Sequence, residues 1–424
     1  MRRPLIASPG ALGALAVGLA LRLGFLSLTP AYFPQKDDLS YLRYGLSIDY
    51  LGRLPIFNRD GVLEPTAYRA PGFPFFLAAV HQVFGGYMHP LRVGQALVGV
   101  ALIAAIGLVA EQLAGRRAAL FSMALAALSP VLVVFGGSLI SEPLYSLLLT
   151  TSLALALKAR RSEQWLGWAI AAGAASGAAA LTRPAWLFAL PAVALIAVPA
   201  RARWPAGVAV VLAGVITIAP WTARNIRVLH AFVPISTEMG NTLAGTYNDQ
   251  SLHDLARPAS WRDPTVSHLY PDAFRKADPS EQDMDRELLG AALRWLSDHP
   301  AYLLKVAYYN GRRMVGLDST RWTADSLRFV SLRPQHGIAS AVRAGLLIAF
   351  LLAIAGALTR PARAAPLGWW LAGLLVLVSA VFVNGVNRFA VPLQPWLLVL
   401  GGMALAAARV PSLRRPRARL KMPA

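Results

Sequence analysis

Long apolar stretches separated by short polar gaps account for most of the chain. Runs of roughly 20 apolar residues have the length that an α-helix needs to cross the hydrocarbon core of a membrane. The pattern predicts ten such helices, at about 10–28, 89–113, 118–136, 142–157, 164–182, 184–199, 204–220, 341–358, 366–383 and 389–408. The predicted fold class is therefore an all-α polytopic membrane protein.

Three parts are expected along the chain. Residues 1–220 form a membrane domain whose first outer loop, 29–88, carries candidate chemistry. Residues 221–340 form an extracytoplasmic segment that is partly helical. Residues 341–424 hold the last membrane helices and a basic cytoplasmic tail.

The apolar stretch 71–87, with Pro71 and Pro74 at its start, is shorter than most of the predicted crossings. Counting it as a crossing would reverse the orientation of every later loop. We therefore interpret it as an interfacial helix that lies on the outer leaflet. Arg2 and Arg3 before the first apolar run also fit a signal peptide, but no small-residue cleavage site follows, so the run is interpreted as a helix.

Helix and turn signals alternate in the outer segment 221–340. Ser280 precedes a run with acidic residues in its first turn and leucines at helical spacing, a pattern that predicts a helix N-terminus. Pro300 is expected to end this helix and to open an amphipathic one that is rich in aromatic residues. Residues 240–280 hold many Pro, Asp and Asn residues and are expected to form a loop.

The composition agrees with a membrane protein. The chain is 56% hydrophobic and 15% charged, whereas about a quarter of the residues of a soluble domain are charged. Its mean hydropathy is +0.49. It contains no cysteine, which excludes disulfides and thiolate metal sites.

The net charge of +20 follows the predicted topology. Every second gap, together with the two termini, holds 17 basic residues against one acidic residue, Glu163. The opposite gaps are balanced, with five basic and five acidic residues in 29–88 and 14 basic and 13 acidic residues in 221–340. Because basic residues concentrate on the cytoplasmic side, both termini are predicted there. The distribution argues against a nucleic-acid partner and for membrane lipids around the basic clusters.

Polar residues within or beside the apolar runs gather at their outer ends. The set comprises Arg22, Asp37, Asp38, Arg92, Gln95, Ser141, Glu142, Arg183, Trp221, Arg224, Asn225, Asn384, Asn387 and Arg388. A charge near the bilayer is costly unless it is paired or faces a water-filled cavity. The distribution therefore predicts a polar cavity that opens to the outer face.

Several of these residues also fit ordinary structural roles. Arg224 could extend from a helix end toward water. Glu142 stands at a helix start, where capping and the helix dipole favour an acid. Arg183 could terminate a helix, and the adjacent Asp37 and Asp38 could solvate a loop.

Seven segments, taken in order, resemble the GT-C membrane glycosyltransferases that use lipid-linked sugars. The segments are KDDLSYLRYGLSIDYLGRLP, YRAPGFPFFLAAVHQVFG, LRVGQALVG, LSP…SEPLYSLLL, ALTRPAWLFALP, APWTARNIRVLHAFVPISTEMGNTLAGTYN and NRFAVPLQPWLLVLGG. They extend over most of residues 15–405 and are similar to protein mannosyltransferases and lipid A aminoarabinose transferases. The aminoarabinose transferases differ in having a Lys where this chain has Arg69.

The resemblance implies a GT-C fold, a polyprenyl-phosphate sugar as donor and a lipid, glycan or protein as acceptor. It places the enzyme in the bacterial cytoplasmic (inner) membrane, with its site on the extracytoplasmic side. It also implies transfer to a hydroxyl or phosphate with inversion at the anomeric carbon. In this family the first acid of the Asp pair is typically the base, so that role falls on Asp37, with Asp38 as second choice or as an orienting residue.

Cations must stabilise the departing phosphate of such a donor. The candidates for binding it are Arg69, Arg224, Arg388 and Arg183. Further residues expected to line the pocket are Tyr41, Arg43, Tyr68, Glu142 and Asn225.

A divalent metal ion is left open as a cofactor. Oxygen and nitrogen ligands in the outer segments are offered by Asp37, Glu64, Glu142, His230, His253 and His268. No pair of these histidines has the spacing of a metal site.

Two other functions are weighed against sugar transfer. A flippase or transporter for a lipid-linked glycan needs polar residues at mid-span or on both faces, whereas this chain is polar at the outer ends. A ligase that transfers a whole glycan from a lipid pyrophosphate also uses outer arginines. The Asp pair and the Tyr-x-x-Pro-Gly segment fit the sugar transferases better.

Overall fold

The computed structural model describes residues 4–52, 55–57, 63–86, 88–198, 204–267, 269–270, 280–333, 335–383 and 387–408. Every apolar stretch that was predicted to cross the membrane contains helix. The helices of these stretches are α1 (Pro9–Leu28), α4 (His89–Ala114), α5 (Arg116–Leu128), α6 (Pro130–Phe135), α7 (Glu142–Arg161), α8 (Trp165–Thr182), η1 (Pro184–Ala189), α9 (Leu190–Ala197), α10 (Trp204–Leu229), α16 (His336–Ala357), α18 (Leu367–Val383), η4 (Asn387–Ala390) and α19 (Gln394–Ala407).

Prolines divide some of the predicted helices. The stretch 118–136 breaks between α5 and α6, where Ser129 caps α6 and Pro130 is its first residue. The stretch 184–199 begins with the 3₁₀ helix η1 at Pro184 before α9 follows. Proline lacks a backbone N–H and clashes with the preceding turn, so it is tolerated at a helix start and interrupts a helix elsewhere.

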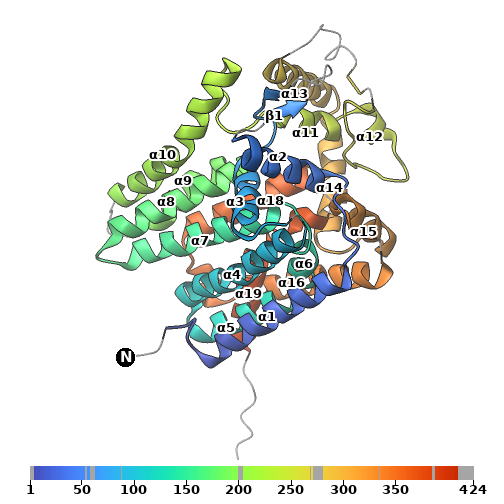
Figure 1. The fold of residues 1–424 in the computed structure, drawn as a ribbon. Helices are drawn as coiled ribbons and strands as arrows, with labels where there is room; N and C mark the ends of the chain where they lie inside the picture. The colour runs from blue at the N-terminus through green and yellow to red at the C-terminus, as the bar shows by residue number, and fades with distance from the viewer. Residues whose placement is uncertain are drawn as a thin grey trace, which may run out of the picture.

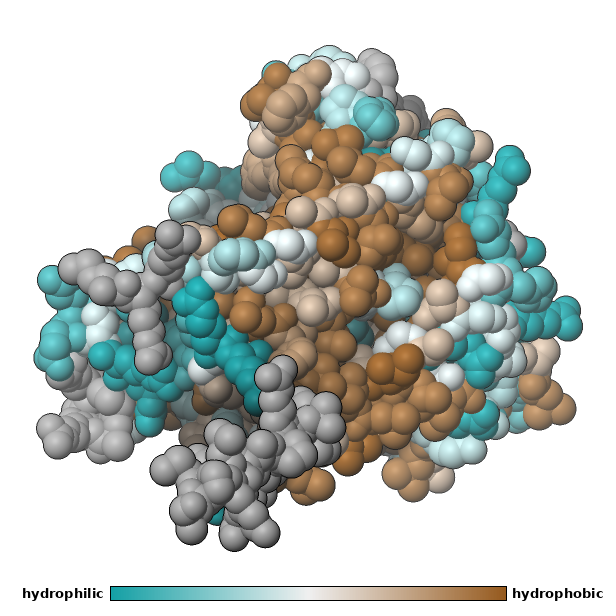
Figure 2. All heavy atoms as spheres, turned by 90° about the horizontal axis from the view of Figure 1, so that it is seen from below, coloured by the Kyte–Doolittle hydropathy of each residue, from teal (hydrophilic) through white to brown (hydrophobic). Residues whose placement is uncertain are grey.

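Five of the described helices are long and apolar enough to cross a membrane. They are α1, α4, α8, α10 and α16. The other stretches are shorter, or broken, or carry more charge, so the number of ten crossings stays a prediction. Figure 2 shows a wide apolar face that is flanked on both sides by polar residues, as expected of a surface in contact with lipid.

Close helix contacts hold this bundle together. A Cβ on Gly356 of α16 would lie 1.9 Å from the carbonyl oxygen of Leu400 in α19, and one on Gly173 of α8 would lie 2.2 Å from that of Val210 in α10. Small residues of this kind let membrane helices approach backbone to backbone.

The elements of the two segments that were predicted to be outer lie mostly at the top and right of the bundle in Figure 1, with α3 nearer its centre. They are α2 (Asp37–Leu51), β1 (Pro55–Phe57), β2 (Leu63–Pro65), α3 (Gly72–Phe84), α11 (Met239–Thr246), α12 (Asp249–His253), α13 (Glu281–Asp298), α14 (Tyr302–Met314), α15 (Thr320–Leu327) and η3 (Arg328–Val330). A short helix α17 (Arg360–Arg363) connects α16 to α18.

The expected features of the outer segment are largely found. The Ser280 hydroxyl caps α13 by accepting from the backbone N–H of Asp283 at 3.3 Å. The next helix, α14, begins two residues after Pro300, as predicted. The expectation of a loop over 240–280 was wrong for α11 and α12, because Asn248 caps α12 and the side chain of Tyr247 packs into a small outer core.

Among the residues that the structure describes, the all-α prediction holds apart from one antiparallel hairpin in the segment 29–88. Its strands β1 and β2 pair with Pro55 opposite Pro65. The hairpin precedes the loop that carries Tyr68 and Arg69.

Candidate active site

A cavity of about 760 Å³ lies among the outer elements. Its walls come from α2, the 68–69 loop, the end of α8, α11, the 257–267 loop, α14, α15 and the turn between α18 and α19. The predicted site residues that line it are Asp37, Tyr41, Tyr68, Arg69, Arg183 and Arg388. Residues far apart in sequence therefore meet in one polar cavity, as the distribution of polar residues predicted.

Asp37 is held between two arginines. Its Oδ1 accepts a hydrogen bond from Nη2 of Arg69 at 2.7 Å, and its Oδ2 accepts one from Nη2 of Arg388 at 2.5 Å. The Asp37 side chain is still 31% exposed, toward the cavity. It stands in the first turn of α2, where the helix dipole favours an acid.

Glu142 forms the second carboxylate of the cluster. It is the first residue of α7 and is completely buried. Arg183 donates to its Oε1, and Nε of Arg388 lies 3.3 Å from the same oxygen. Arg388 therefore links Glu142 to Asp37.

Arg69 extends the cluster to α11. Its Nη1 donates to Oε2 of Glu238 at 3.1 Å, and its guanidinium lies 5.2 Å and 5.3 Å from the ring centres of Tyr41 and Tyr68. The Tyr68 hydroxyl accepts from Nδ2 of Asn241 at 2.9 Å. Contacts with two aromatic rings help to hold the guanidinium in place.

These pairs determine the charge of each group. Burial alone would raise the pKa of Asp37, but the charges and hydrogen bonds of Arg388 and Arg69 outweigh it and hold the pKa well below its usual range. The pKa of each arginine is raised, since its pairing with Asp37 outweighs burial, which by itself would lower it. All three side chains therefore stay charged at physiological pH.

Asp38 has a different environment. Its side chain is fully buried and accepts from the Tyr32 hydroxyl at 2.6 Å and the Ser331 hydroxyl at 2.9 Å. It also accepts from the backbone N–H groups of Lys36 and Leu39, both at 3.1 Å. Asp38 does not line the cavity. It anchors the start of α2, which fixes the position of its neighbour Asp37.

Besides Asp38 and Glu142, three further predicted residues lie outside the cavity lining. Arg224 donates to the backbone carbonyl of Thr66 at 2.8 Å and lies over the Trp221 ring. Asn225 is buried and donates to the carbonyl of Val233 at 3.0 Å. Arg43 is exposed on α2. Arg224 thus binds the backbone of the loop that leads to Arg69.

The cavity also contains charged and aromatic residues that the sequence did not single out. They are Lys36, Glu238, Arg257, Trp261, Arg262, Asp263, Arg313, Trp322, Asp325 and Arg328. Most come from the outer segment 221–340, where charge is common and gives no signal by itself. Glu238 lies in the sixth of the family-like segments, two residues before Gly240 and Asn241. This position was the signal in the sequence that could have identified it as a site residue.

Lys36 and Arg257 differ from the other cations that line the cavity. Neither side chain forms an ion pair or hydrogen bond in the described part of the chain, and both are exposed. Arg262 pairs with Asp254, and Arg313 pairs with Asp318 at 3.3 Å.

The candidate metal ligands do not come together. Within the described ranges, no group of three or more His, Asp or Glu side chains is placed to hold a metal. Asp37 and Glu142 already bind arginines, and His230 and His253 are exposed. His268 lies outside the described residues, and so does the side chain of Glu64.

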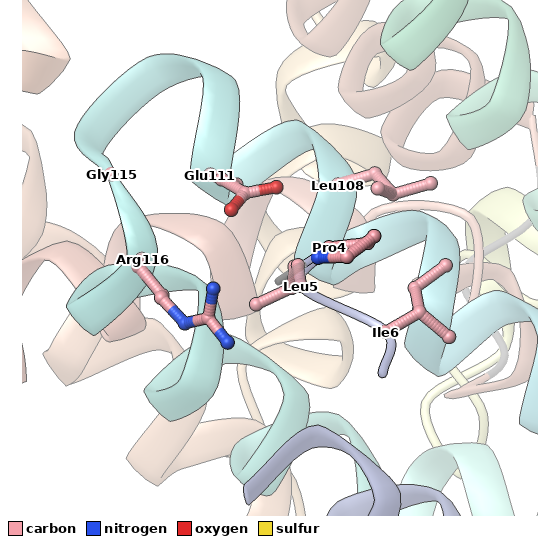
Figure 3. Close-up of a pocket in the computed structure, with 7 residues that line it drawn as sticks. All are labelled: Pro4, Leu5, Ile6, Leu108, Glu111, Gly115 and Arg116. Atoms are coloured by element: carbon pink, nitrogen blue, oxygen red, sulfur yellow. The ribbon is translucent and has the colours of Figure 1, made fainter. Parts of the chain in front are cut away.

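A second cavity, of about 520 Å³, lies at the other end of the bundle (Figure 3). Pro4, Leu5 and Ile6 line it together with the end of α4 and the start of α5, including Glu111 and Arg116. The 26 residues of α4 span roughly 39 Å at the helical rise. This cavity is therefore remote from Asp37.

Comparison with known proteins agrees with this architecture. Residues 68–223 match the family model described as dolichyl-phosphate-mannose-protein mannosyltransferase. That part of the chain includes Tyr68, Arg69, Glu142 and Arg183. No curated protein is similar enough in sequence to this chain to count as a match.

Solved structures extend the similarity to nearly the whole chain. The oligosaccharyltransferase of Archaeoglobus fulgidus, in complex with Zn and sulfate, superimposes with a TM-score of 0.54 at 16% identity, over 92% of this chain and 48% of its own. The same enzyme, AglB, in complex with an inhibitory peptide and a dolichol-phosphate gives a TM-score of 0.56 at 15% identity, over 93% and 50%. The chain thus spans about half the length of the archaeal enzyme.

A weaker similarity is found to ArnT from Cupriavidus metallidurans bound to undecaprenyl phosphate. It has a TM-score of 0.46 at 16% identity, over 94% of this chain and 78% of ArnT. The fold assignment does not depend on it. From the helical architecture, the outer cavity and the superposition on AglB, the chain is a multi-pass membrane protein with the GT-C fold.

Proposed function

We propose that this protein is an integral membrane glycosyltransferase that moves a sugar from a polyprenyl-phosphate donor to a hydroxyl or phosphate of an acceptor. The reaction takes place at the outer face of the bacterial cytoplasmic membrane, with both termini in the cytoplasm. The observation that carries the proposal is Asp37, ionised and exposed to the cavity between Arg69 and Arg388. The match of residues 68–223 to the mannosyltransferase model and the dolichol-phosphate bound by AglB support the choice of donor.

The donor phosphate is recognised by the cations of the cavity. The side chains of Lys36 and Arg257 form no ion pair or hydrogen bond in the described part of the chain, so they offer the first attraction to an incoming anion. Arg183 and Arg388 are planar donors that can exchange a carboxylate for a phosphate oxygen. Sharing Arg388 with the phosphate frees one oxygen of Asp37.

The freed carboxylate is then the base. Asp37 is a weak base while two arginines bind it, because they lower its pKa. When the donor phosphate binds and neutralises one of these arginines, the pKa of Asp37 rises. Asp37 is then a stronger base in the donor complex, in which it accepts the proton.

The transfer itself is a single displacement. Asp37 accepts the proton of the acceptor hydroxyl as its oxygen attacks the anomeric carbon from the face opposite the phosphate. The bond from that carbon to the phosphate oxygen breaks, and the electron pair leaves with the polyprenyl phosphate. The anomeric configuration inverts, and the arginines stabilise the charge that develops on the phosphate.

The experiment compares wild type with Asp37→Asn and a matched control, Asp298→Asn, whose carboxylate is exposed on α13 away from the cavity. Purified proteins receive a panel of radiolabelled polyprenyl-phosphate sugars and a membrane extract. Asp37→Asn is expected to reduce transfer by at least about 100-fold, the usual contribution of a general base, and Asp298→Asn to leave it unchanged. Normal transfer by Asp37→Asn would disprove the mechanism.

The same assay separates the two alternatives. AglB is an oligosaccharyltransferase, so a ligase that moves a whole glycan is the second candidate function. A labelled product that carries more than one sugar from a lipid-linked oligosaccharide would favour it. Movement of labelled lipid across a liposome bilayer without any transfer would favour a flippase.

A further inference from the structure

The carboxylate of Glu281 joins two segments of the site without lining the cavity. Its Oε2 accepts from the Thr66 hydroxyl at 2.6 Å. Its Oε1 accepts from the backbone N–H of Ala67 at 3.0 Å and from the Thr237 hydroxyl at 2.5 Å. One side chain at the start of α13 therefore binds the loop before α3 and the loop before α11.

These two loops carry the partners of an ion pair in the site. Arg69 follows Ala67 by two residues, and Glu238 follows Thr237 directly. The loops are also joined by the backbone N–H of Thr237, which donates to the carbonyl of Ala67 at 3.1 Å. Glu281 therefore helps to hold the two loops together at the Arg69–Glu238 ion pair. The contact of Arg69 with Asp37 depends on the same arrangement of loops.

Neighbouring contacts reinforce the joint. Asp285, one turn further along α13, accepts from the backbone N–H of Gly240 at 2.6 Å, which ties the helix to the start of α11. Arg224 donates to the carbonyl oxygen of Thr66 at 2.8 Å. Of Glu281, Asp285 and Arg224, it is Glu281 that binds both loops. It accepts from two threonine hydroxyls and from one backbone N–H.

From these contacts we propose that Glu281 is a positioning residue, which holds Arg69 and Glu238 in register so that Arg69 presents a fixed guanidinium to Asp37. The proposal rests on the proposed function only for its effect on catalysis. A displacement of an active-site group by about 1 Å can slow a reaction roughly 100-fold, so a residue outside the cavity can have a large effect on the rate.

The test is a double-mutant cycle. Wild type, Glu281→Gln, Glu238→Gln and the double variant are compared in transfer rate and in the temperature of thermal unfolding. Glutamine keeps the size of the side chain but replaces one accepting oxygen with an amide N–H, which cannot accept the hydroxyl donors of Thr66 or Thr237. Asp298→Asn is the matched control, because Asp298 is an exposed acid of the same helix that does not line the cavity.

If Glu281 acts through the Arg69–Glu238 pair, its substitution lowers kcat roughly tenfold in the wild-type background and has little further effect once Glu238 is replaced. The donor KM changes less than kcat, and Asp298→Asn has no effect on either. Additive effects of the two substitutions on both kcat and unfolding temperature would overturn the proposal, since sites that do not interact are additive.

Failure of the proposed function would give a separate result. If the wild type transfers no sugar, the proposed function is wrong, and the unfolding temperatures of the same four proteins still decide the inference. Coupling between Glu281 and Glu238 in stability supports the joint, and additivity refutes it.

Discussion

Adjacent residues of one chemical type have opposite environments in this site. Asp37 is partly exposed to the cavity and bound by arginines, whereas Asp38 is fully buried and bound by hydroxyl and backbone donors. Successive side chains of a helix point about 100° apart, so the start of α2 turns one carboxylate to the cavity and the other into the protein. Two acids in one motif can thus divide the roles of reactive group and anchor.

The residue-scale prediction concerns this division of roles. Asp38→Asn should destabilise the protein by about 1–3 kcal/mol, because a neutral amide replaces a buried acceptor of several hydrogen bonds. Thermal unfolding in detergent measures the loss, with Asp37→Asn as the comparison. We expect the lower unfolding temperature for Asp38→Asn and the larger loss of transfer for Asp37→Asn. The reverse order would reject the anchoring role of Asp38.

Among the elements, close contact between helices positions the outer ends that carry the site. Gly356 of α16 packs against the backbone of α19, and the turn before α19 carries Arg388. A side chain at this glycine would push against a carbonyl group, which cannot move aside as a flexible side chain can. The position of Arg388 therefore depends on a contact deep in the helix bundle.

The element-scale prediction compares two glycines. Gly356→Val should lower the unfolding temperature markedly, since overpacking a tight contact costs about 1–3 kcal/mol or more. Gly13→Val, on α1, is the control, because a Cβ there meets no atom within 4 Å. The measurement is thermal unfolding of both variants in the same detergent. Equal stability of the two variants would show that the α16–α19 contact is not tight.

For the whole molecule, the separation of charges along the sequence predicts an inner and an outer side. The basic clusters are at one end of the predicted crossings, and the cavity with Asp37 is at the other. This arrangement depends on α3, whose apolar sequence could be counted as a crossing. If α3 lies on the membrane surface and does not cross it, the segments 29–88 and 221–340 are on the same side and can form the site together.

The whole-molecule prediction uses the absence of native cysteine. Asp298→Cys, in α13, should react with a membrane-impermeant maleimide in intact cells. Gln164→Cys, in the gap before α8, should react only after permeabilisation. Both positions are exposed, so accessibility to the reagent depends on the side of the membrane. The opposite pattern would mean that the orientation of the whole protein is reversed and that the cavity faces the cytoplasm.

The sequence by itself determined the helical membrane architecture and showed which polar residues stand at the ends of the helices. Hydrophobic runs and charge bias are local properties of the chain, and they depend little on how the helices pack. The motif residues Asp37, Arg69, Arg183 and Arg388 were all placed in one cavity, as predicted.

Only the tertiary structure decided which polar residues meet. It placed Arg224 against a backbone carbonyl and brought in Glu238 and Glu281 from an outer segment where charged residues are common. Such contacts join positions more than 150 residues apart, for example Arg69 and Glu238. Long-range contacts depend on how loops and helices pack in three dimensions, and no periodicity along the chain records them.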